Sequence, residues 1–149
     1  MRIVINQFIS LDGVIQAHGG PEEDTDGGFA HGGWSLAFFD PETIGGAIGE
    51  AFSTVDALLF GRRTFRGMEQ AWPERAGDPF ADQMNAIEKH VVSGTLSADD
   101  ITWNNAHLIP ADGALDAIRE LRARDGGDLC VMGSATLSRS LIEADLVDE

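Results

Sequence analysis

The sequence is poor in several features that mark large classes of protein. Cys130 is the one cysteine among 149 residues, so an intrachain disulfide cannot form. Its apolar neighbours in "LCVM" predict a small buried side chain rather than a reactive thiol. No apolar run approaches the ~20 residues of a membrane-spanning helix. Met1 leads directly into a strand-like segment and not into a secretion signal. We therefore expect a cytoplasmic protein with no membrane partner.

Basic residues are also scarce. The chain has 10 Lys and Arg against 25 Asp and Glu, which gives a net charge of −15 and disfavours binding to nucleic acid. Arg2 is the one basic residue before Gly61, whereas Arg62, Arg63 and Arg66 follow within about one helical turn. This local positive charge favours a small anionic ligand. The alternative is a solvated helix face whose arginines pair with nearby acids.

Several catalytic and metal-binding motifs are absent. The chain has no G-x-S-x-G elbow, which disfavours a serine hydrolase. The segment "DTDGG" lacks the other ligands of a calcium loop, so we predict no metal site. The polar, glycine-rich residues 16–35 around it are instead typical of a mobile acidic lid. Without internal repeats or a linker, residues 1–149 are expected to form a single domain.

The order of apolar patterns predicts an α/β fold with a central, mostly parallel sheet flanked by helices. The expected strands are 2–11, 56–60, 89–95, 99–104 and the start of 128–146. The expected helices are 40–52, 62–70, 112–127 and the end of 128–146. Asp40 and Asp112 are typical helix caps, because a short carboxylate can accept hydrogen bonds from the first N–H groups.

Three of the strands end in small or hydroxyl residues, in "FGRRT", "VSGT" and "MGSATL". Ligands of parallel sheets bind at the carboxyl ends of strands, and a helix that begins there offers N–H groups to a phosphate. Gly61 and Gly133 would let a ligand approach the backbone, and Arg62 and Arg63 would add charge-assisted contacts. The three stretches together favour a dinucleotide. Because "MGSATL" is not G-x-G-x-x-G, an ordinary Rossmann domain is disfavoured.

Four stretches carry a more specific resemblance: "FISLDGVI", "LLFGRRTF", "HVVSGTL" and "VMGSATLSRSLIEADLVDE". In this order and spacing, over essentially the whole chain, they resemble the dihydrofolate reductase-like fold. Within this fold they resemble the branch that includes the reductase domain of riboflavin biosynthesis. The resemblance implies a reductase that uses NADPH as its cofactor.

The resemblance also implies a role for each stretch. "GRRT" would contact the adenosine 2′-phosphate, "SGT" the adenine ribose, "GSATL" the pyrophosphate, and "LDGVI" would flank the nicotinamide. The cofactor-binding residues implied in this way are Gly13, Val14, Ile15, Gly61, Arg62, Arg63, Thr64, Ser93, Gly94, Thr95, Gly133, Ser134, Ala135, Thr136 and Leu137.

The substrate side is less defined. The resemblance implies a small heterocycle, pterin-like or pyrimidine-like. Trp34, Phe38 and Phe39 either line a pocket for this flat ring or belong to the core. Asp12 is the acid we assign near the reacting ring as a catalytic residue, although it could instead shape a turn, with water as the proton donor. Folate enzymes place an acid on the first helix, but here Asp40 is explained as a cap.

Members of the resembled family continue past "LVDE" with two long antiparallel strands, which this sequence lacks. We expect either a fragment or a sheet without its usual last edge. Because exposed strands pair with other chains, a homo-oligomer is expected. Two alternatives to the reductase stay open: a non-catalytic nucleotide- or small-molecule-binding module on the same fold, and an oligomerising domain whose site has decayed.

Overall fold

A computed structural model describes residues 1–75 and 77–149 of the chain. The chain divides into two compact units. The larger unit comprises Met1–Asn6 and Val55–Glu149, and the smaller unit comprises Gln7–Thr54. The larger unit contains the whole sheet, and the smaller unit contains the long polar loop and the first helix.

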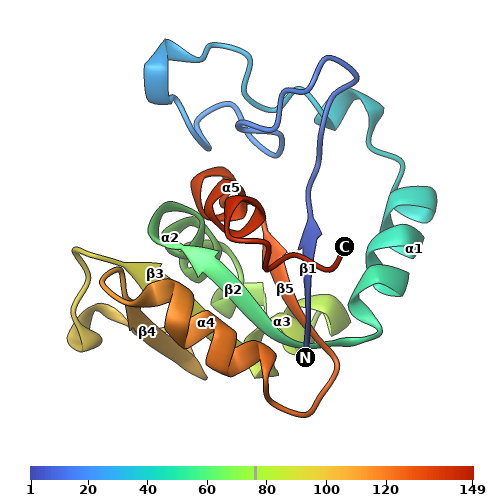
Figure 1. Cartoon of the computed structure of the whole chain (residues 1–149). Helices are drawn as coiled ribbons and strands as arrows, with labels where there is room; N and C mark the ends of the chain where they lie inside the picture. Colours follow the sequence, from blue (N-terminus) through green and yellow to red (C-terminus); the bar gives the residue numbers. More distant parts are fainter. Residues whose placement is uncertain (76) are drawn as a thin grey trace. The chain divides into compact units, whose positions relative to one another are not determined.

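The larger unit is built on a five-stranded sheet in the order β1-β5-β2-β3-β4 (Figure 1). Its strands are β1 (Arg2–Asn6), β2 (Val55–Gly61), β3 (Glu88–Ser93), β4 (Ala106–Pro110) and β5 (Asp128–Met132). Every strand pair among the described residues is parallel. The prediction of an α/β fold with a mostly parallel sheet is therefore confirmed.

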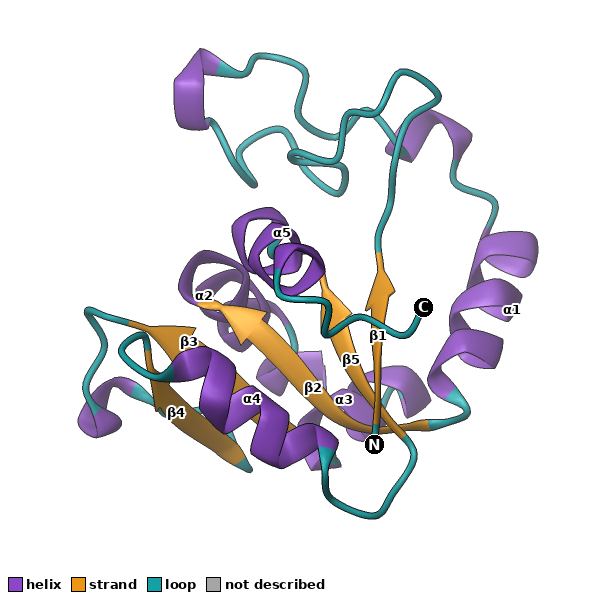
Figure 2. Cartoon of the chain, in the orientation of Figure 1, coloured by secondary structure: helices purple, strands orange, loops and turns teal. Residues whose placement is uncertain are grey.

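Four helices of the larger unit flank the sheet (Figure 2). They are α2 (Arg62–Ala71), α3 (Pro79–Ala86), α4 (Ala114–Arg122) and α5 (Ala135–Glu143). Within the described part of the chain, no helix has both the length and the apolar character needed to cross a membrane.

The alternation of side chains along β2 explains why both faces of the sheet are covered. Ala57 and Leu59 belong to the apolar core that includes Ile118 of α4 and Leu141 of α5. On the other face, the ring of Phe60 lies 6.4 Å from that of Phe65 on α2 and 6.3 Å from that of Trp103. Successive residues of a strand point to opposite faces of the sheet. An unbroken apolar run therefore needs a covering helix on each face.

The last residues of the chain lie along the outer edge of β1. The Ile5 N–H donates to the carbonyl of Glu149 (2.8 Å), and the Asp148 N–H donates to the carbonyl of Ile3 (2.8 Å). The Ile3 N–H donates to Asp148 Oδ2 (2.8 Å), and Arg122 Nη2 donates to the other oxygen of that carboxylate (2.5 Å). These backbone groups of β1 are thus hydrogen-bonded within the chain. The homo-oligomer stays a prediction.

In the smaller unit, helix α1 (Pro41–Phe52) begins as predicted. The Thr43 N–H donates to Asp40 Oδ2 (3.0 Å), which makes Asp40 the N-cap. The polar loop before it closes on itself, because the Gly33 N–H donates to the carbonyl of Ala17 (2.7 Å). The loop contains a short 3₁₀ turn at Asp26–Gly28, and a second one at Leu36–Phe38 follows the loop.

Three local predictions were wrong. Residues 99–104 are not a strand: Ser97 and Asp100 form a capping box that starts a 3₁₀ turn, and β4 begins only at Ala106. The N-cap of α4 is Gly113 and not Asp112, because the chain enters this helix through a left-handed residue (φ 78°). The first strand ends at Asn6 and not at residue 11.

The single lysine of the chain is buried under α3. Lys89 has 0% of its surface exposed, and its Nζ donates to the carbonyls of Ile87 (2.6 Å) and Asn85 (3.2 Å), at the end of α3. The ammonium also lies 4.6 Å from the ring centroid of Trp103. Burial lowers the pKa of Lys89 to about 8 from 10.5, because desolvation penalises the charged form.

This shift predicts a pH dependence of stability. Between pH 8 and 10.5 the unfolded chain holds the Lys89 proton more tightly than the folded chain does, so the lysine's contribution to the free energy of unfolding rises with pH. In this window we expect the free energy of unfolding of wild type to rise, relative to that of Lys89→Met, by up to about 1.4 kcal/mol per pH unit. Urea unfolding of both proteins at several pH values measures this difference. Both proteins contain Cys130, so any titration of its thiol contributes equally and cancels. Parallel pH curves would show that the pKa of Lys89 is not lowered.

Candidate active site

The three stretches predicted to bind a dinucleotide lie at one edge of the sheet. Strand β2 pairs with β5 on one side and with β3 on the other, and all three run in the same direction. Their carboxyl ends are therefore neighbours. The structure brings together Gly61–Thr64, Ser93–Thr95 and Gly133–Leu137, as the sequence predicted.

Two hydrogen bonds lock the ends of β2 and β5 together. The Gly61 N–H donates to Ser134 Oγ (2.9 Å), and the Ser134 N–H donates to Thr64 Oγ1 (3.1 Å). Gly133 between them has φ +59°, and a Cβ there would lie 3.3 Å from Thr64 Cγ2. A side chain at position 133 would crowd this contact, which explains the glycine. We call these two hydrogen bonds the Ser134 interlock.

The Ser134 interlock holds two helix N-termini side by side. Helix α2 begins directly after Gly61, and α5 begins directly after Ser134. Neither N-cap accepts a side-chain hydrogen bond from the first turn of its own helix: Gly61 has no side chain, and the Ser134 hydroxyl accepts from the Gly61 N–H instead. Both helices therefore present first-turn N–H groups and a partial positive charge at this edge of the sheet. A phosphate fits such a pair of helix ends.

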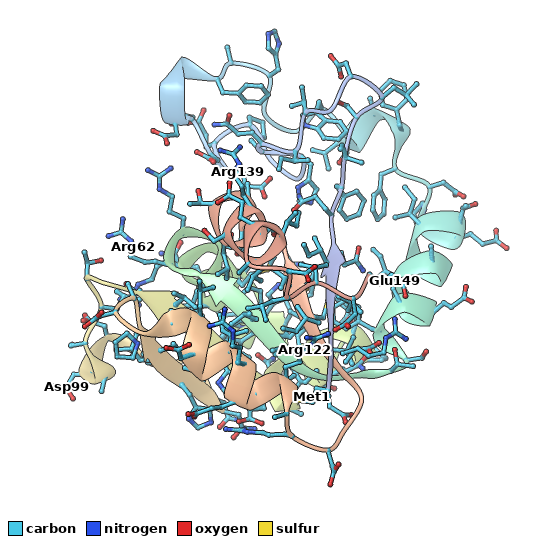
Figure 3. The ribbon with its side chains drawn as sticks, viewed as in Figure 1. Met1, Arg62, Asp99, Arg122, Arg139 and Glu149 are labelled. Carbon is cyan, nitrogen blue, oxygen red and sulfur yellow. The ribbon has the colours of Figure 1, made fainter. Side chains whose placement is uncertain are left out.

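The arginines of α2 differ in their surroundings. Arg66 Nη1 donates to Glu69 Oε2 (2.6 Å) and to the carbonyl of Asp100 (2.8 Å), so its charge is compensated. Arg62 is exposed, and its Nη1 donates to the hydroxyl of Thr95 (3.0 Å) at the end of β3. Among the described residues, no carboxylate forms an ion pair with Arg62. Figure 3 shows Arg62 extending outward from the ribbon. Its uncompensated charge suits an anion.

The turn after β3 is ordered by a buried serine. Ser93 is 6% exposed, and its Oγ accepts hydrogen bonds from the N–H groups of Thr95 (3.1 Å) and Leu96 (3.0 Å). A Cβ at the intervening Gly94 would lie 3.3 Å from that of Ala111. Ser93 therefore shapes the turn that carries Thr95, and the absence of a side chain at Gly94 leaves room for Ala111.

A groove between α4 and α5 opens beside these turns. It has a volume of about 440 Å³, and its walls include Val92, Ala111, Leu115 and Leu137. Val92 directly precedes the Ser93 turn, and Leu137 lies in the first turn of α5. Of these four, Leu137 is the one predicted from the sequence to bind the cofactor. The others belong to ordinary apolar patterns, so no sequence signal distinguishes them from core residues.

Asp12 lies in the smaller unit, at the tip of a tight turn. Ser10 Oγ donates to Asp12 Oδ1 (2.5 Å) and accepts a hydrogen bond from the Val14 N–H (2.9 Å). Gly13 has φ +89°, a left-handed conformation that glycine adopts readily. The hydrogen bond from Ser10, aided by a backbone N–H, lowers the pKa of Asp12 below 3.8. Asp12 is therefore ionised at neutral pH and can accept a hydrogen bond, but it holds no proton to give.

The other residues predicted to contact substrate or nicotinamide also lie in the smaller unit. Trp34 Nε1 donates to the carbonyl of Gln16 (3.0 Å), which fixes the indole against the base of the polar loop. Phe38 and Phe39 are 83% and 43% exposed. This exposure disfavours the alternative that the two phenylalanines are core residues. Ile15, like Val14, is half-buried.

Comparison with known proteins identifies the family of this chain. The family model described as "RibD C-terminal domain" matches residues 2–149, and the chain belongs to this family. It is therefore a dihydrofolate reductase-like, reductase-type domain, in a family related to NADPH-binding reductases. The chain is also 25% identical, over 153 aligned positions, to "Uncharacterized protein YyaP" of Bacillus subtilis (strain 168). The match covers 99% of this chain and 71% of that protein.

The Ser134 interlock predicts a difference between two substitutions. Ser134 is left-handed (φ 53°), which disfavours any residue with a Cβ by roughly 1–2 kcal/mol. Ser134→Ala loses the hydrogen bond from Gly61 and keeps the strain, at a cost of about 1 kcal/mol. Ser134→Gly loses the same bond and relieves the strain, so we expect it to be the more stable variant. Urea unfolding midpoints measure the order, and equal midpoints would contradict the role of the left-handed backbone.

Proposed function

We propose that this protein is an NADPH-dependent reductase that transfers a hydride to a pterin-like or pyrimidine-like small molecule. The observation that carries the proposal is the environment of Arg62. In a chain with a net charge of −15, this guanidinium is held by the neutral hydroxyl of Thr95 and is paired with no carboxylate of the described residues. An arginine without a carboxylate partner, at the carboxyl-terminal edge of a parallel sheet, suits the 2′-phosphate that distinguishes NADPH from NADH.

The neighbouring helix ends fit the rest of the cofactor's charge. The first-turn N–H groups of α5, at Ala135, Thr136 and Leu137, would hold the pyrophosphate. Gly133 has no side chain to block the approach, and the Ser134 interlock fixes this turn against the start of α2. The residues present therefore fit a dinucleotide phosphate chain, and we assign that role to them.

The groove between α4 and α5 suits the adenine. Its apolar walls at Val92, Ala111 and Leu137 can cover the faces of a flat ring, and Ser140 adds a hydroxyl at the same groove. The groove adjoins the Ser93 turn, so an adenine bound there would leave its ribose near Thr95 and its 2′-phosphate near Arg62. Exposed side chains of Asp116 and Arg119, which pair with each other at 2.7 Å, border the entrance.

For the chemistry, NADPH when bound supplies the hydride, and this chain orients the reactants and tunes their charge. Trp34, Phe38 and Phe39 would stack on the substrate heterocycle, because aromatic faces bind flat rings. The ionised Asp12 would accept a hydrogen bond from a ring N–H of the substrate. Since Asp12 has no proton to give, water would protonate the reduced ring.

The ionised state of Asp12 also favours a second candidate function. A chain that binds a dinucleotide but places no proton donor could serve as a nucleotide- or small-molecule-binding module. NADPH oxidation with a panel of pterins and pyrimidines separates the two functions. Turnover of any one of these substrates supports the reductase. Tight NADPH binding with no turnover across the panel supports the binding module.

The assignment of Arg62 predicts a cofactor-specific loss of affinity. One charge-assisted contact contributes about 1.5–3 kcal/mol, so Arg62→Ala should weaken NADPH binding by about 10- to 150-fold. Binding of NADH, which lacks the 2′-phosphate, should change little. The difference should shrink as salt rises, because Arg62 is exposed and screened. Dissociation constants from titrations of intrinsic tryptophan fluorescence measure both cofactors.

Arg66→Ala is the matched control for this experiment. It removes the same charge from the same helix, but Arg66 is already paired with Glu69 and Asp100. We expect it to leave the ratio of the two dissociation constants unchanged, even where it lowers stability. An equal loss of NADPH and NADH affinity in Arg62→Ala would mean that Arg62 does not recognise the 2′-phosphate.

A further inference from the structure

Resting on the proposed function, we propose that Thr95 is a positioning residue. It acts through Arg62 to set the preference for NADPH over NADH. The juxtaposition behind this is the hydrogen bond from Arg62 Nη1 to Thr95 Oγ1 (3.0 Å), which joins the start of α2 to the turn after β3. The two residues are 33 positions apart in the sequence, and the pairing of β2 with β3 brings them together.

Arg62 needs such a partner because it is exposed. A long side chain in solvent samples many rotamers, and ordering it on a ligand reduces affinity. The hydroxyl of Thr95 restricts the guanidinium before the ligand arrives. One of the five N–H donors of the guanidinium is used in this contact, so the others remain for a phosphate. Thr95 therefore orders the Arg62 side chain and leaves most of its N–H donors available to a ligand.

A neutral partner matters as much as an ordered one. A carboxylate at this position would hold Arg62 equally well but would cancel its charge, as Glu69 and Asp100 do for Arg66. The Thr95 hydroxyl restrains the arginine and leaves its positive charge available. Position 95 thus controls whether Arg62 can attract an anion.

Thr95 is itself held in place from the core side. The buried Ser93 accepts hydrogen bonds from the N–H groups of Thr95 and Leu96, and its Oγ lies 3.4 Å from Thr95 Oγ1. Space beside the turn is limited as well, because a Cβ at position 94 would lie 3.3 Å from that of Ala111. The end of β3 therefore holds Thr95 in place through these hydrogen bonds, and Thr95 in turn restrains the guanidinium of Arg62.

A double-mutant cycle with two ligand pairs tests this proposal. The proteins are wild type, Thr95→Val, Thr95→Ser, Arg62→Ala and Arg62→Ala with Thr95→Val. The pairs are NADPH against NADH and 2′,5′-ADP against 5′-AMP. The two ligands of each pair differ in the 2′-phosphate, and the second pair lacks the nicotinamide. The measured quantity is the ratio of dissociation constants within each pair. Thermal unfolding of each variant shows whether it is folded.

We expect Thr95→Val to reduce the preference for the 2′-phosphate by about 2- to 12-fold, the range of one neutral hydrogen bond. Thr95→Ser, which keeps the hydroxyl, should restore most of the preference. In the Arg62→Ala background, Thr95→Val should have no further effect on the ratio. Thr95→Asp, as an additional variant, should lose the preference because its carboxylate would neutralise Arg62.

Two outcomes would overturn the inference alone. If Thr95→Val leaves both ratios at the wild-type value while Arg62→Ala lowers them, Arg62 needs no positioning by Thr95. If Thr95→Val lowers the ratios equally with and without Arg62, Thr95 contacts the phosphate directly. A different outcome sinks the proposed function as well: if Arg62→Ala leaves both ratios unchanged, the site does not read the 2′-phosphate.

Discussion

The arrangement of the candidate site depends on the hydrogen bonds between the ends of β2 and β5. A parallel sheet only makes strand ends neighbours, and it does not fix how the helices after them point. Here Ser134 Oγ accepts from the Gly61 N–H, and Thr64 Oγ1 accepts from the Ser134 N–H. Each side chain satisfies a backbone donor of the other strand end, so α2 and α5 start in a fixed relation. The left-handed Ser134 and the side-chain-free Gly133 are the local consequences of this arrangement.

Charge then distinguishes this edge of the sheet from the rest of the surface. Most arginines of the described chain lie against carboxylates: Arg66 pairs with Glu69, Arg119 with Asp116, and Arg122 with Asp148. Arg62 forms no such ion pair among the described residues, a property that it shares with Arg75 and Arg139, but it is the one of these three that lies at the carboxyl-terminal edge of β2. The hydroxyl of Thr95 explains how Arg62 can be restrained and still keep its charge. The strongly negative net charge strengthens the contrast, since it disfavours binding of large polyanions, whereas the local positive charge of Arg62 would favour a small anion.

Much of this could be predicted from the sequence, because the informative signals are local. The short apolar run before Gly61 and the N-cap at Asp40 each depend on a few adjacent residues, and both predictions were confirmed. Helix α3 was missed, and 99–104 was misread as a strand, because a capping box at Ser97 outweighed the apolar character of Ile101 and Trp103. The Arg62–Thr95 contact and the Ser134 interlock could not be foreseen. They join residues 33, 70 and 73 positions apart, through side-chain geometry that no local pattern encodes.

The turn at Asp12 shows why a residue type alone does not define a catalytic role. An acid near a reducible ring can donate a proton only if its pKa is raised, as burial in an apolar pocket does. Asp12 is exposed and accepts a short hydrogen bond from Ser10, which lowers its pKa instead. The same bond places Ser10 to accept from the Val14 N–H, so the carboxylate is part of the turn's construction. The chemistry that this turn supports is therefore hydrogen-bond acceptance by an anion. A substrate ring with an N–H group would suit it, and in the proposed reaction the proton would come from solvent.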